Sequence, residues 1–279
     1  MKKAKIDLAL KPNAQMLEAE SVHGEPVIFK LTDRYEVEVL QRLHANRFTK
    51  PTRIIPLLDV IDGRLLVLPL RYRLLHFLKL HASVGDVELL ALQFLEGVAH
   101  LQLSSVAHLD LKPNNIVVQW DRGSKKVDLN IIDFDTSVFA DDEPIISGLR
   151  GTPGWFAPEV SAEKPYNPLL ADRWSCGRVL VFFMEHMKPS RVRETMHLCS
   201  RQLMDPDPSL RPRVADVVSS CLQGMWGMLT TTQFPVSRAP RPKRGRLPKE
   251  RELQARASPP VLRLPKDIEL RARASTPVF

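Results

Sequence analysis

The spacing of apolar residues divides most of the chain into short strands and helices. A β-branched and aromatic run at residues 26–30 predicts a strand. Thr32 or Asp33 can cap a helix over residues 34–43, because its apolar positions then fall on one helical face. The residues of that face are Val37, Leu40 and Leu43.

The same pattern predicts further strands and helices along the chain. Residues 172–187 are apolar nearly all round, which is typical of a helix at the centre of a core. Asp62-Gly63 marks a tight turn before one of the strands. In chain order we expect strands at 54–58 and 64–69, a helix at 87–103, a hairpin of strands at 116–118 and 129–132, and helices at 172–187 and 214–229.

Residues 236–279 differ in composition from the rest of the chain. They hold twelve Lys and Arg against four Asp and Glu, so the whole formal charge of +8 lies there. A segment dominated by Pro, Arg and Lys cannot bury enough apolar area to offset the entropy cost of ordering it. Residues 246–261 recur, with changes, at 263–278. We therefore expect a disordered basic tail that carries a duplicated short linear motif.

Composition argues against several classes of protein. The chain before the tail has balanced charge, so no nucleic acid partner is indicated for the core. The three cysteines lack metal-ligand spacing and imply no disulfide framework, which fits a reducing compartment. No apolar run is long enough to span a bilayer, and Asp7 and Pro12 interrupt any signal-peptide core. We expect no membrane partner and an intracellular location, cytoplasmic or nuclear.

The candidate chemistry lies in two short segments. Residues 108–115 read HLDLKPNN, and after the predicted hairpin residues 133–135 read DFD. Phosphoryl transfer needs a carboxylate to accept the proton of the attacking hydroxyl, oxygen ligands for magnesium, and a cation that neutralises developing charge. Residues of these types are Asp110, Lys112, Asn115 and Asp133.

These segments resemble the catalytic loop of eukaryotic protein kinases, His-Arg-Asp-Leu-Lys-Pro-x-Asn, and their magnesium-binding Asp-Phe-Gly. Small-molecule kinases of the aminoglycoside and choline type share the shorter skeleton, so three further segments carry the identification. Residues 151–159 resemble the end of a Ser/Thr kinase activation segment, and residues 172–177 the start of the family's central helix. Arg211, in a third matching segment, pairs in the family with the position of Glu159.

The resemblance implies an α+β fold of the protein-kinase-like, two-lobed type. The domain would cover residues 22–235, after a poorly defined segment at 1–21. A truncated, β-rich N-lobe would occupy residues 22–68, and a mainly α-helical C-lobe would occupy residues 71–235.

The resemblance also assigns the catalytic roles. Asp110 would accept the hydroxyl proton, with Lys112 beside it, while Asn115 and Asp133 would hold Mg²⁺. Lys112 and Thr152 match Ser/Thr kinases rather than tyrosine kinases. The implied reaction is transfer of the ATP γ-phosphoryl group to Ser or Thr of a protein substrate, with ATP and Mg²⁺ as cofactors.

Further residues would bind the nucleotide. Lys30 matches the lysine that contacts the α and β phosphates, and Glu36 matches the helix glutamate that pairs with it. Glu38 is the competing candidate for that pairing. Leu68 and Leu70 would lie at the hinge beside the adenine.

The chain departs from the family pattern at several positions. The phosphate-covering glycine loop is missing near residues 8–13, and Ile28 replaces a small alanine above the adenine. Leu109 replaces the arginine that reads activation-loop phosphorylation, and Asp135 replaces the glycine of Asp-Phe-Gly. The short stretch of residues 178–210 implies a shortened or absent substrate-docking helix.

These departures leave alternatives open. The chain is either a working Ser/Thr protein kinase or a catalytically silent pseudokinase that acts as a binding module or scaffold, with a small-molecule kinase as a third option. Lys30 and Glu36 could form an ordinary surface pair, and His108 reads as a core histidine rather than a proton carrier. Self-phosphorylation of the tail at Ser258 and Ser275, each preceded by Arg-Ala, is a further hypothesis.

Overall fold

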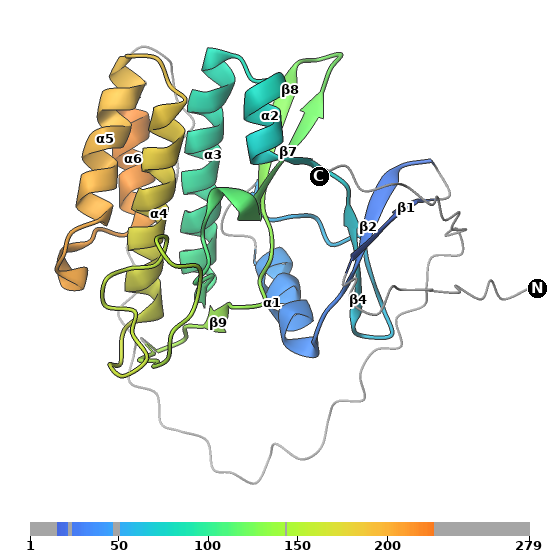
Figure 1. Ribbon diagram of the computed structural model, residues 1–279, viewed down its shortest axis with the longest axis horizontal. Helices are drawn as coiled ribbons and strands as arrows, with labels where there is room; N and C mark the ends of the chain where they lie inside the picture. The colour runs from blue at the N-terminus through green and yellow to red at the C-terminus, as the bar shows by residue number, and fades with distance from the viewer. Residues whose placement is uncertain (1–15, 22–23, 47–50, 143, 226–279) are drawn as a thin grey trace, which may run out of the picture.

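The chain folds into a small lobe that contains a sheet and a larger helical lobe (Figure 1). The computed structural model describes residues 16–21, 24–46, 51–142 and 144–225. The expected α+β class and the two-lobed arrangement are confirmed. The basic tail, its repeats and the positions where a glycine loop was expected lie outside the described residues.

The N-lobe is built on a four-stranded antiparallel sheet in the order β1-β2-β4-β3. Side chains alternate along β2, so Val27 and Phe29 pack on one face while Lys30 lies on the other. This alternation turns the lysine toward the space between the lobes. The strands are β1 Met16–Glu20, β2 Pro26–Leu31, β3 Asp59–Ile61 and β4 Leu65–Pro69.

Helix α1, Arg34–Ala45, lies between the sheet and the helical lobe (Figure 1). Of the two predicted cap candidates, Thr32 and Asp33, it is Asp33 that caps the helix, because its side chain accepts the backbone N–H of Glu36 at 3.0 Å. Leu40 and Leu43 are buried in the main hydrophobic core, which they share with the helices of the C-lobe. Helix α1 therefore joins the two lobes.

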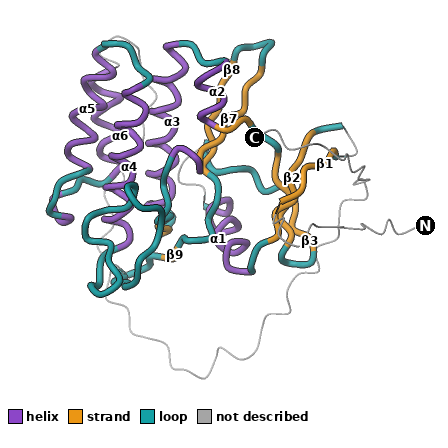
Figure 2. Tube along the Cα trace, in the orientation of Figure 1, coloured by secondary structure: helices purple, strands orange, loops and turns teal. Residues whose placement is uncertain are grey.

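The C-lobe is a bundle of helices with a strand hairpin beside it (Figure 2). Helix α4 packs against α3 and α5, and α6 packs against the same two helices, so the all-round apolar segment is central as predicted. None of the described helices is long and apolar enough to cross a membrane. The helices are α2 Leu74–Leu80, α3 Val84–Leu103, α4 Pro168–Glu185, α5 Arg191–Leu203 and α6 Val214–Met225. The strands are β5 Tyr72–Arg73, β6 Val106–Ala107, β7 Ile116–Asp121, β8 Lys126–Ile131 and β9 Val138–Phe139.

The prediction of a strand at residues 54–58 is wrong. This segment runs along the end of β8: the Ile55 N–H donates to the carbonyl of Ile131 at 3.1 Å, and the Ile131 N–H donates to that of Arg53 at 2.8 Å. Pro56 has no N–H with which to continue a strand ladder. The strand that pairs with β4 on the side away from β2 is β3, further along the chain.

Among the described helices and strands of five or more residues, three were not predicted from the apolar pattern. Strand β1 pairs with β2 along its whole length, although it lies before residue 22, where we expected the domain to begin. Helices α2 and α5 are the other two. Helix α5 is the one α-helix in the described stretch between α4 and Arg211, where we expected a shortened or absent docking helix.

Gly177 allows α4 and α5 to approach closely. A Cβ atom at this position would lie 2.6 Å from Met204 Cγ and 2.9 Å from the Ser200 carbonyl oxygen, both far inside van der Waals contact. We expect Gly177→Ala to lower the free energy of unfolding by about 1–3 kcal/mol, because the two helices must separate. Urea unfolding followed by circular dichroism measures this change.

Gly85→Ala is the matched control, since a Cβ at Gly85 meets no atom within 4 Å. Alanine favours a helix over glycine, so this variant should be neutral or up to about 1 kcal/mol more stable. Equal stability of the two alanine variants would contradict the close approach of α4 and α5.

Candidate active site

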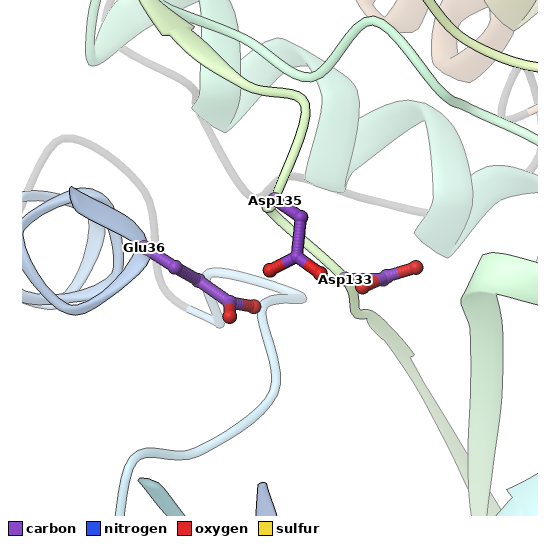
Figure 3. A group of neighbouring side chains, drawn as sticks. All are labelled: Glu36, Asp133 and Asp135. Carbon is purple, nitrogen blue, oxygen red and sulfur yellow. The ribbon is translucent and has the colours of Figure 1, made fainter. Parts of the chain in front are cut away.

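Lys30 is the centre of a buried ion cluster. Its Nζ lies 2.8 Å from Glu36 Oε1, 2.7 Å from Asp133 Oδ1 and 3.0 Å from Asp135 Oδ1. Figure 3 shows Glu36 extending from α1 toward the two aspartates, which lie on the segment after β8. Lys30 is 4% exposed, so the carboxylates replace the water that would otherwise solvate its charge. The predicted lysine–glutamate pair is therefore a buried contact and not a surface pair.

Glu36 is held on several sides. Its Oε1 accepts the backbone N–H of Phe134 at 3.2 Å, and its Oε2 accepts the hydroxyl of Thr32. Glu38, the competing candidate, is exposed on the outer side of α1. The structure therefore selects Glu36 as the partner of Lys30.

The cluster shifts the pKa values of its members. Burial opposes a charge on Lys30, but Glu36 and Asp133 outweigh it and raise the Lys30 pKa above its ordinary value. Burial, assisted by a hydrogen bond with Asp135, raises the pKa of Glu36 against the pull of Lys30. Burial also acts to raise the pKa of Asp135, yet the hydrogen bond with Glu36 and the Lys30 charge hold it below its ordinary value.

Asp110, Lys112 and Asn115 lie together in a second group. Lys112 Nζ donates to Asp110 Oδ2 at 2.6 Å and to Thr152 Oγ1 at 2.6 Å, and Thr152 donates to Asp110 Oδ1 at 2.8 Å. The 3₁₀ turn Pro113–Asn115 places the Asn115 amide where it donates to Asp110 Oδ2 at 3.1 Å. The carboxylate is thus fixed from both sides by donors that lie up to 42 residues away in the sequence.

Asp172, at the start of α4, anchors the loop that carries Asp110. Its carboxylate accepts the backbone N–H of His108 at 2.5 Å and that of Leu109 at 2.8 Å. Burial raises the pKa of Asp172 to about 7, although both N–H donors act in the opposite direction. The sequence marked Asp172 as the start of a helix but gave no sign of this contact, which joins residues 64 apart.

His108 joins the two chemical segments. Its Nδ1 accepts the Asp110 N–H at 3.3 Å, and its Nε2 donates to the Ile132 carbonyl at 3.0 Å. Burial lowers its pKa, so the ring is neutral in this tautomer. Its ring lies 5.0 Å from that of Phe134. The Ile132 N–H in turn donates to the Asn115 carbonyl at 3.0 Å, which holds the end of the hairpin beside Asn115 as predicted.

The pairing expected between Glu159 and Arg211 is present. Arg211 Nη1 and Nη2 lie 2.5 and 2.9 Å from the two Glu159 oxygens, a bidentate contact made by a fully buried guanidinium. Arg211 also donates to the carbonyls of Asp205 and Leu170. This contact fixes the end of the segment that carries Thr152.

Leu68 and Leu70 lie where the chain crosses between the lobes. Leu68 pairs with Ile28 across β4 and β2, and the Leu70 N–H donates to the Pro26 carbonyl at 3.0 Å. Both leucines are half-buried. Their position fits the predicted hinge, and contact with an adenine stays a prediction.

The carboxylate oxygen atoms of the ion cluster around Lys30 fit a hard divalent cation. Oxygens of Glu36, Asp133 and Asp135 lie within 4.8 Å of one another. Because the Asn115 nitrogen donates to Asp110, its carbonyl oxygen is the atom suited to a metal. Magnesium prefers such carboxylate and amide oxygens.

Two departures from the family pattern can be located. Leu109 is buried in an apolar cluster with Ala157 and Tyr166, so no cation for reading a phosphate stands at this position. Asp133 and Leu109 adopt positive φ angles of 72° and 63°, but Asp135 does not. Aspartate in place of glycine at residue 135 therefore adds charge to the site without straining the backbone.

A set of side-chain contacts between α1 and the segment after β8 was not predicted. Arg42 Nη1 donates to both oxygens of Asp141, at 3.1 and 2.8 Å, and its guanidinium lies 4.2 Å from the centre of the Phe139 ring. The Phe139 N–H donates to the Tyr35 hydroxyl at 2.9 Å. Tyr35 and Arg42 lie on the same helix as Glu36, so these contacts help to orient it.

Comparisons with known proteins agree with this geometry. The family description "Protein kinase domain" matches residues 34–230. The chain is 44% identical over 94 residues to the mitochondrial serine/threonine-protein kinase ppk24 of Schizosaccharomyces pombe. This match covers 32% of the chain and 19% of that protein. It is 33% identical over 136 residues to serine/threonine-protein kinase ppk8 of the same yeast (45% and 26% covered) and 27% identical over 172 residues to human death-associated protein kinase 2 (61% and 43% covered). The matches thus span less than half of the length of these relatives.

Removing the carboxylate of Asp172 should destabilise the loop that carries Asp110. Asp172→Ala leaves two buried N–H groups without an acceptor, at a cost of about 1–3 kcal/mol each. We expect a clear loss of unfolding free energy in urea. Asp216→Asn, which disrupts an exposed ion pair with Arg213, should change it by less than about 1 kcal/mol. Equal unfolding curves for the two variants would show that Asp172 does not anchor the loop.

Proposed function

The chain belongs to the protein kinase domain family, and on that premise we propose that it is a Ser/Thr protein kinase. It would transfer the γ-phosphoryl group of ATP to a hydroxyl of a protein substrate. The observation that carries the proposal is the carboxylate of Asp110, held at 2.6–2.8 Å by Lys112 and Thr152 on a loop that His108 links to the segment of the Lys30–Asp133 pair. The family uses ATP and a divalent metal in general, and Mg²⁺ is the specific part of the proposal.

Asp110 acts as the base in this mechanism. It accepts the proton of the Ser or Thr hydroxyl while that oxygen bonds to the γ-phosphorus and the bond to the bridging oxygen of the β-phosphate breaks. Because Lys112, Thr152 and Asn115 already orient the carboxylate, the proton transfer needs little rearrangement. Lys112 supplies a positive charge where negative charge develops on the transferred group.

The nucleotide would lie between the lobes. Lys30, oriented by Glu36, would bind its α and β phosphates, and Leu68 and Leu70 would flank the adenine. Magnesium, held by Asp133 and by the carbonyl oxygen of Asn115, would neutralise phosphate charge.

The three cysteines are free and buried, in accord with a reducing cytoplasmic or nuclear compartment.

A silent pseudokinase that acts as a scaffold is the alternative function. Loss of a chemical residue is the usual mark of that class, and here Lys30, Asp110, Asn115 and Asp133 are all present within two linked groups. The proposal therefore favours an enzyme, and an assay of phosphoryl transfer separates the two.

Asp110→Asn and Asp133→Asn should each abolish phosphoryl transfer. Removing a positioned base lowers a rate by about 100- to 10,000-fold, and removing a carboxylate ligand weakens the metal site. A single-turnover assay with radiolabelled ATP and Mg²⁺ measures the rate, and hydrolysis of the product should release phosphoserine or phosphothreonine. Asp62→Asn, in an exposed turn before β4, should retain the wild-type rate. Transfer that survives both site substitutions, or product that is mainly phosphotyrosine, would refute the mechanism.

We also propose that the domain phosphorylates its own tail at Ser258 and Ser275. Both serines follow Arg-Ala in the duplicated motif, a pattern that resembles sites of basophilic Ser/Thr kinases. Attachment to the domain raises the local concentration of the tail to about millimolar, so a weak docking surface is sufficient. Asp135 and Asp141 already pair with Lys30 and Arg42. The covalent attachment of the tail therefore supports this proposal more than attraction between the basic tail and these two carboxylates does.

Mass spectrometry after incubation with ATP and Mg²⁺ tests the tail sites. We expect phosphate at Ser258 and Ser275 in the wild type and none in Asp110→Asn. The labelled fraction should not depend on protein concentration, because an intramolecular reaction does not require two protein molecules to meet. Equal labelling of the two proteins, or no label in an otherwise active wild type, would rule out self-phosphorylation at these serines.

A further inference from the structure

All hydrogen-bond donors of Lys30 are in use. An ammonium group has three N–H bonds, and the three carboxylate contacts at 2.7, 2.8 and 3.0 Å account for one each. A nucleotide phosphate can accept a hydrogen bond from Lys30 only after one carboxylate moves away. The identity of that carboxylate decides how the site opens.

Asp135 is the carboxylate that is freest to move. The Glu36 side chain is 2% exposed and also accepts from Phe134 and Thr32. The Asp133 side chain is 35% exposed and makes the shortest contact with Lys30. The Asp135 side chain is 51% exposed, makes the longest of the three contacts, and extends from a backbone without positive φ.

Charge also opposes a nucleotide in this state. Three carboxylates around one ammonium leave a formal charge of −2 at the point where anionic phosphates must approach. A divalent cation brings the charge that balances this excess, and it would attract the Asp133 and Asp135 oxygens away from Lys30. With glycine at residue 135, as in the family pattern, Lys30 would keep one donor free for a phosphate.

We propose that Asp135 is a positioning residue that occupies Lys30 until a divalent cation is present, and so makes nucleotide binding depend on the metal. This inference rests on the proposed function, because it assumes that ATP binds beside Lys30. It assigns to Asp135 a role that acts through Lys30 and not through contact with the substrate.

Calorimetric titration of the full chain with ATP, in EDTA and in saturating Mg²⁺, tests the proposal. Asp135→Asn keeps the shape of the side chain and removes its charge. Since one nearby charge changes such an equilibrium by about tenfold or more, this variant should bind ATP about tenfold more tightly than wild type in EDTA. In Mg²⁺ the difference should be much smaller. Asp135→Gly should behave like Asp135→Asn, and Asp135→Glu should resemble wild type.

Two controls separate this role from general effects. Asp62→Asn removes one negative charge from the same lobe at an exposed turn and should leave both affinities unchanged. In a Lys30→Ala background, Asp135→Asn should lose most of its effect, because the contact it releases is no longer there.

The outcomes are distinguishable. If Asp135→Asn binds ATP in EDTA no better than wild type, or gains equally in EDTA and Mg²⁺, the proposed role of Asp135 is wrong while the kinase assignment stands. If neither wild type nor any Asp135 variant binds ATP in either condition, the proposed function fails and this inference fails with it.

Discussion

The need to neutralise one buried ammonium group organises the structure. A charge removed from water must be paired within the protein, because the cost of leaving it alone is several kcal/mol. Lys30 lies on the inner face of β2 and finds its partners on α1 and on the segment after β8. The sheet, helix α1 and the C-lobe must therefore meet at one point, and the shared core around Leu40 and Leu43 holds them there.

The helical lobe supplies the rigidity that a loop lacks. The loop with Asp110 is anchored through two backbone N–H groups to Asp172 on α4, the helix that packs between α3 and α5. His108 connects it to the end of β8, and the buried Arg211 fixes the far end of the segment with Thr152. Reacting groups are placed to within a fraction of an ångström only when such supporting contacts hold them.

The departures from the family pattern change the charge around the site more than its backbone. Leu109 fills with apolar packing a position that the family gives to a cation, and Asp141 provides a permanent anion for Arg42 on α1. Asp135 adds a third carboxylate to Lys30 without backbone strain. The ion pair between Asp141 and Arg42 thus supports the orientation of α1. The third carboxylate adds an electrostatic cost to the approach of phosphates to Lys30.

The sequence alone determined the features that depend on neighbouring residues. A helix cap at Thr32 or Asp33, the hairpin after Asn115 and the apolar helix α4 follow from local spacing. The order of residue types in the two chemical segments, together with the three further matching segments, indicated the family. Only the tertiary structure showed the buried contact of Glu36 with Lys30, moved the third strand of the sheet beyond residue 58, and placed Asp135 on Lys30. Lys30 and Asp135 lie 105 residues apart, and the meeting of such residues depends on how the lobes pack, which no local periodicity encodes.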